Sequence, residues 1–128
     1  KVREILEAEA AFTAANNVSE TDIKNAQKNL KMVETQNPYS MLSHWQSDEE
    51  VHGLFIDACP NRVLRTVIRS LRATTKLFEI ENLAERLEPD SRQHETILTS
   101  LLSRDQEASK ASVQLHIKSL YKFALRVL

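Results

Sequence analysis

The chain has 128 residues, which is enough for one domain with a single sizeable core. Its net charge of −1, from 17 basic and 18 acidic residues, gives no electrostatic case for nucleic-acid binding by this segment. One glycine and three prolines are too few for the turns of a sheet protein, so we expect helices joined by short connections. No apolar run approaches the roughly 20 residues that a membrane-spanning helix needs, and we expect no membrane partner.

The first helix is expected over residues 1–15. Its apolar side carries Ile5, Leu6, Ala8 and Phe12. Ser19 then has the position of an N-cap, and Asp22 completes a capping box three residues later. The second helix should run to about residue 35. The Asn37-Pro38 pair breaks it, because the residue before proline is pushed out of helical geometry.

The third helical stretch is expected over residues 39–59 and ends at Pro60. A bend near Ser47 is suggested by the spacing of Ser47 and Glu50, which resembles another capping box. Asn61 can cap the following helix. That helix has an apolar side of Leu64, Val67, Ile68, Leu71, Thr75 and Phe78.

The rest of the chain predicts a short helix over residues 81–87 that stops near Pro89, another helix beginning at Ser91, and a last helix capped by Asp105. We therefore expect six or seven helices and no strand, packed as an all-α antiparallel bundle that forms one domain over residues 1–128.

Three histidines fall on the apolar faces of three different predicted helices. His52 shares a face with Phe55 and Ile56. His94 lies three and four residues before Ile97 and Leu98, and His116 lies between Val113 and Leu120. Asp48 lies one turn before His52 on the same face. Helical phasing therefore turns three imidazoles and one carboxylate toward the core.

A single histidine on an apolar face is usually a core residue with a satisfied hydrogen bond. Three such rings and a carboxylate would be costly to bury together without partners, and a divalent cation would satisfy all of them. This donor set suits Zn, Ni, Mn or Fe, and zinc accepts it readily. The alternative is a metal-free helical interaction module. The single cysteine, Cys59, is expected to be a small core residue.

Two further metal chemistries can be weighed from the same segment. Glu49 and His52 form a Glu-x-x-His pair, but the second pair that a di-iron bundle needs is absent, so a di-iron oxidase is not expected. A mononuclear metal-dependent hydrolase would need Glu49 or Glu50 as its general base, and neither lies on the face of Asp48. His44 is interpreted as a peripheral residue.

The spacing of these residues resembles a known family. The segments "REILEAEAAFTAA", "DEEVHGLFIDACPNRVL", "RQHETILTSLLSRD" and "DQEASKASVQLHI" together resemble the C-terminal effector-binding domain, or FCD domain, of GntR-type transcription regulators of the FadR subfamily. The resemblance covers nearly the whole chain. It includes an Asp-x3-His motif, a later histidine followed by Ile-Leu, and a closing helix with its own histidine.

The resemblance implies a regulatory domain that performs no catalysis. By position, its metal ligands would be Asp48, His52, His94 and His116, and Arg3 would be an effector-binding residue. The implied partners are a small carboxylate effector and a second copy of the chain in a homodimer. Operator DNA would be contacted only through a winged helix-turn-helix upstream of Lys1, in a cytoplasmic protein of which this chain is a part.

A basic stripe follows Asn61. It consists of Arg62, Arg65, Arg69, Arg72 and Lys76, spaced by three and four residues. The plainer interpretation is a solvated or salt-bridged face, and the alternatives are contact with another domain, a partner subunit or an anionic effector. An arginine at the edge of the stripe could reach the cavity. The one glycine, Gly53, suggests a close approach of another helix or a ligand.

Overall fold

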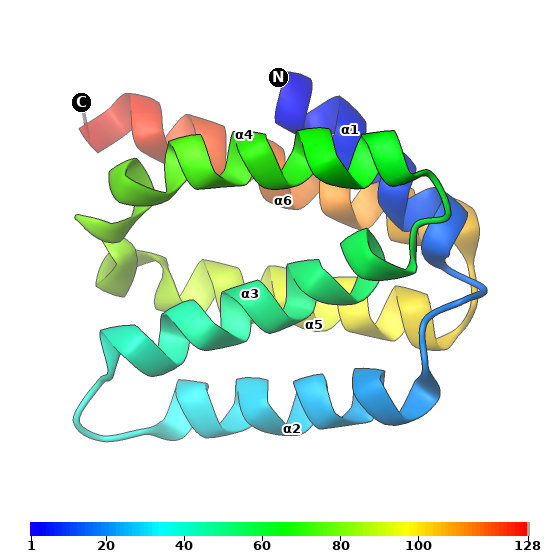
Figure 1. Cartoon of the computed structure of the whole chain (residues 1–128). Helices are drawn as coiled ribbons and strands as arrows, with labels where there is room; N and C mark the ends of the chain where they lie inside the picture. The colour runs from blue at the N-terminus through cyan, green and yellow to red at the C-terminus, as the bar shows by residue number, and fades with distance from the viewer. Residues whose placement is uncertain (128) are drawn as a thin grey trace.

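The computed structural model describes residues 1–127, apart from the side chain of Leu77. The elements are α1 (Val2–Ala14), α2 (Glu20–Thr35), α3 (Met41–Ala58), α4 (Arg62–Ile80), the short 3₁₀ helix η1 (Leu83–Arg86), α5 (Leu87–Leu102) and α6 (Gln106–Val127). No strand occurs within the described residues. From α2 to α6, consecutive α-helices run in opposite directions (Figure 1), which confirms the predicted all-α bundle.

The helices lie at three levels. Helix α2 packs against α3 and α5, and α1, α4 and α6 lie on the other side of that middle pair (Figure 1). The core between these levels is made of fully buried aliphatic and aromatic side chains, among them Phe55, Ile56, Ile97, Leu98 and Val113. This places the inner faces of α3, α5 and α6 toward one another.

Helix α1 buries small side chains. Its alanines at the core, none more than 1% exposed, are Ala8, Ala10, Ala11 and Ala14. Such small residues let α1 pack closely on α6 and α3. The predicted apolar side of this helix was wrong at Ile5, which is 56% exposed, and the buried face instead includes Glu7.

The predicted caps are present. The side chains of Ser19, Asn61 and Asp105 accept hydrogen bonds from the backbone N–H groups of Asp22, Leu64 and Ala108. Each bond satisfies a donor that the first helical turn leaves without a partner. Cys59 is buried in the core, as expected.

Three local predictions were wrong. Helix α3 continues without interruption through Ser47. Pro89 does not stop a helix but lies in the first turn of α5, where a missing N–H costs nothing because those groups have no acceptor within the helix. A Cβ on Gly53 would meet only Asp57 Oδ2, at 3.8 Å, so nothing approaches this glycine closely. Among the described residues, no helix is both long enough and apolar enough to cross a membrane.

Candidate metal centre

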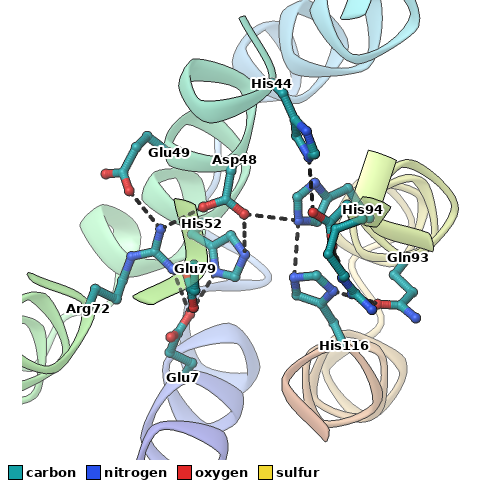
Figure 2. A network of polar contacts seen from close by, with 12 residues as sticks. Glu7, His44, Asp48, Glu49, His52, Arg72, Glu79, Gln93, His94 and His116 are labelled. Carbon is teal, nitrogen blue, oxygen red and sulfur yellow. Dashed lines mark hydrogen bonds and ion pairs between the residues drawn. The ribbon is translucent and has the colours of Figure 1, made fainter. Parts of the chain in front are cut away.

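The four predicted ligands converge inside the bundle (Figure 2). Asp48 and His52 come from α3, His94 from α5 and His116 from α6, and each offers one atom within 4.8 Å of the other three. All four side chains are buried. Asp48 Oδ1 lies 3.4 Å from Nε2 of His52 and 3.4 Å from Nε2 of His94. The Nε2 atoms of His94 and His116 are 3.1 Å apart.

The far side of the His52 ring is held by α1. Its Nδ1 lies 2.7 Å from Oε1 of Glu7. A carboxylate only accepts hydrogen bonds, so Nδ1 must carry the hydrogen. In the neutral ring, Nε2 therefore keeps its lone pair and directs it into the cluster.

The His116 ring is also held through its Nδ1, in this case by the side-chain amide of Gln93. Its Nδ1 lies 2.7 Å from Oε1 of Gln93. The same oxygen accepts from Arg86 Nη2 at 3.1 Å, and the Gln93 amide nitrogen donates to Ser119 Oγ at 2.9 Å. Because these two contacts fix the orientation of the amide, Nδ1 of His116 is the donor and its Nε2 is left to act as a ligand.

One buried atom of the cluster, Nε2 of His52, has no hydrogen-bond partner among the described residues. An imidazole lone pair next to a carboxylate oxygen needs a proton or a metal ion between them. Burial and the charge of Arg72 would lower the pKa of His52, yet the carboxylates of Asp48 and Glu7 raise it. The residues present therefore fit a divalent cation.

Asp48 and His116 have the charge states that a metal ligand requires. Burial would raise the pKa of Asp48, but His52, the hydrogen bond to His94 and the charge of Arg72 hold it well below its ordinary value. Burial, together with the neighbouring His94 and His52, keeps the pKa of His116 well below its ordinary value. A deprotonated carboxylate and a neutral imidazole are both competent ligands.

Two arginines surround Glu7, the partner of His52. Arg3 forms an ion pair with Glu7 one turn along α1, and Arg72 of α4 has Nη1 at 3.6 Å from Glu7 Oε1. Burial would raise the pKa of Glu7, but His52 and Arg3 lower it to about 2. Arg72 also contacts Asp48 Oδ2 at 3.1 Å and Glu49 Oε1 at 2.9 Å. Glu7 therefore stays ionised, and its contacts with His52 and Arg72 connect α1 and α4 to the cluster.

Arg3 also forms an ion pair with Glu79 of α4, with Nη1 at 2.5 Å from Oε1. Its predicted role as an effector-binding residue stays a prediction. Of the basic stripe, Arg72 is the member that turns inward. Arg69 pairs with Asp57 on the surface, and Lys76 lies 4.4 Å from the centre of the Trp45 ring.

The remaining candidates lie outside the cluster. His44 is buried rather than solvated, and it contacts Tyr39 Oη at 2.7 Å and Asp90 Oδ2 at 3.0 Å. Glu49 pairs with Arg72, and Glu50 accepts from Asn29 at 3.1 Å. Both candidate general bases of the hydrolase alternative are thus engaged by other side chains.

Sequence reasoning missed the two residues that orient the rings, Glu7 and Gln93. Only Glu7 carried a signal, because it shares its helical face with Ala11 and Ala14, whose small side chains mark close packing. An acid on such a face has to find a buried partner. Gln93 follows an arginine and precedes His94, and nothing in that pattern indicates burial.

Comparison with known proteins gives one finding. Residues 1–119 match the FCD domain. No curated protein and no solved structure matches the chain. The match covers nearly the whole chain and all four residues of the cluster, although it does not distinguish a subfamily. The chain belongs to the FCD domain family.

Proposed function

We propose that this chain is the ligand-sensing domain of a GntR-type transcription regulator, and that it binds a divalent metal through Asp48, His52, His94 and His116. The observation that carries the proposal is the convergence of three Nε2 atoms and one carboxylate oxygen, drawn from three helices. Two of the rings have their Nδ1 atoms held by Glu7 and Gln93, as metal-binding histidines usually do.

The donor set limits which metals fit. Three imidazoles and one carboxylate suit Zn, Ni, Mn or Fe, and zinc accepts this set readily. Four protein ligands fill the tetrahedral arrangement that zinc prefers, so an effector would have to expand the coordination to five, as happens in some catalytic zinc sites. When bound, the metal supplies a positive charge and a place where an anionic effector can attach.

The effector that fits this centre is a small carboxylate. The metal ligands belong to α3, α5 and α6, while Glu7 and Arg72 connect the same cluster to α1 and α4. A ligand at the metal would therefore contact a point that five helices share. If it binds one arrangement of these helices more tightly than another, it shifts the population between them. An upstream DNA-binding domain in a homodimer could respond to that shift.

A thermal-shift experiment tests this proposal. The metal-loaded chain is heated with each of a panel of small carboxylates, including hydroxy acids, sugar acids and simple alkyl or aryl acids, with and without a chelator. The proposal expects at least one carboxylate to raise the melting temperature, and the chelator to remove that increase. If no carboxylate raises it, or if the chelator changes nothing, the proposed sensing mechanism is wrong.

A further inference from the structure

A cavity opens beside Asp48 at one end of the bundle. It is formed by the C-terminal halves of α4 and α6 together with η1. Asp48 is the member of the metal cluster that lines it. A molecule in this cavity would therefore have one end at the cluster and the other near the mouth.

The walls of this cavity are mainly apolar. The apolar side chains that line it from α4, η1 and α6 are Phe78, Leu83, Leu120, Phe123, Ala124 and Val127. At the mouth, Phe78 is 44% exposed and Val127 is 41% exposed, so apolar surface there faces water. A hydroxyl group placed against these walls would lose its hydrogen bonds to water without gaining others, whereas an apolar group would gain from leaving water.

Apart from Asn82 and the indole of Trp45, the polar side chains that line the cavity have partners of their own. Arg86 contacts Asp90, Gln93 and Ser119. Glu79 forms the ion pair with Arg3. The hydroxyl groups of a sugar acid would have to compete with these contacts, and the penalty for breaking a buried pair is large.

The charged side chains of the cavity indicate where the carboxylate of an effector would lie. Asp48, Glu79 and Asp90 supply three carboxylates to the cavity, and each is paired with an arginine: Arg72, Arg3 and Arg86, respectively. Without a metal, these pairs leave no excess positive charge to attract an anion. With a divalent ion at the cluster, the attractive end for a carboxylate is the end at Asp48.

We infer that the effector is a monocarboxylic acid with an aromatic or branched aliphatic tail, and that the tail lies against Phe78, Leu120 and Phe123 while the carboxylate faces the Asp48 end. The inference rests on the proposed function, because it takes the metal centre as the site of the carboxylate. It goes further by excluding the strongly hydroxylated acids as the preferred class.

Calorimetric titration of the metal-loaded chain tests the preference. The probes are 3-phenylpropionate and 4-methylpentanoate on one side, and lactate and gluconate on the other. We expect the apolar acids to bind about tenfold more tightly or better, since each carries a tail that the cavity can remove from water. If lactate or gluconate binds as tightly, the inference is wrong and the proposed sensing function stands. If none of the four binds, the inference is wrong, and the sensing function fails as well if no other carboxylate of the thermal-shift panel raises the melting temperature.

Two variants of α4 test whether the apolar tail of the acid lies in this cavity. Phe78→Asn changes an exposed wall residue of α4, and Val67→Asn changes a residue of the same helix that is 40% exposed and does not line the cavity. We expect Phe78→Asn to weaken 3-phenylpropionate binding about fivefold or more, with the metal content unchanged, and Val67→Asn to leave it unaltered. Equal affinities in both variants would overturn the placement. Binding of 2-phenylethylamine as tight as that of the acid would overturn the carboxylate head.

Discussion

His52 and His116 are held in the same geometry by groups of different charge. The Nδ1 of His52 donates to a carboxylate, Glu7, that lies between two arginines of α1 and α4. The Nδ1 of His116 donates to a neutral amide, Gln93, that is held by Arg86 and Ser119. Both contacts fix a ring, but the charged one also makes the ring more basic and carries structural ion pairs. The two halves of the centre should therefore respond differently to substitution.

The largest effect on folding is expected at the Glu7 side of the centre, where a carboxylate holds His52. Glu7→Gln removes a fully buried carboxylate and leaves Arg3 and Arg72 without a shared partner. We expect the free energy of unfolding to fall by about 3–5 kcal/mol, the usual result of breaking a buried ion pair from one side. Urea denaturation of the chelator-treated protein measures this without any contribution from the metal. A loss below about 1 kcal/mol would contradict the role given to Glu7.

A smaller effect, on metal affinity, is expected at the Gln93 side of the centre, where an amide holds His116. Gln93→Leu removes the acceptor for Nδ1 of His116, so the ring can adopt the other tautomer or rotate. We expect the metal dissociation constant to rise about 10-fold or more, which a competition titration with a chromogenic chelator can measure.

The matched control for that variant is Gln93→Glu. It keeps an acceptor at the same position and adds a charge next to Arg86. Its metal affinity should equal or exceed that of the unchanged chain, because a carboxylate makes the ring a stronger ligand. If the two variants lose metal equally, His116 is not oriented through this contact.

The smallest effect is expected on the surface of α4. Arg69 and Arg72 belong to the same basic stripe, but the Arg69 side chain is 47% exposed and its partner Asp57 is 67% exposed. Arg69→Ala should change the free energy of unfolding by less than about 0.5–1 kcal/mol and should leave metal binding unaltered. Thermal and urea denaturation test this. A larger loss would mean that the stripe acts as a unit rather than through Arg72 alone.

The helices and the convergence of the four candidate ligands could be predicted because both depend on local periodicity. Asn61 capped a helix in the predicted way, and the spacing of His94 to Ile97 and Leu98 fixed the direction of its ring. Pro89 was misread because proline stops a helix from within but is tolerated in the first turn, and the sequence does not show which turn it occupies.

The side chains that support the ligands could not be predicted in the same way. Charged residues on a helix are usually solvated, and Arg72 differs from its neighbour Arg69 only in which way its turn of α4 faces. Gln93 becomes an acceptor for His116 only when α5 packs on α6. Such contacts between helices depend on the packing angle, which helical periodicity does not give.

The most direct test of the metal centre is the metal content of the purified chain, measured by elemental analysis after incubation with zinc, nickel or manganese and removal of excess ion. We expect about one ion per chain. The ion should be lost in His94→Ala, which removes a ligand, and retained in His44→Gln, which alters a buried histidine outside the cluster. An unchanged chain that holds no metal, or a His94→Ala variant that holds as much, would contradict a metal centre at these four residues.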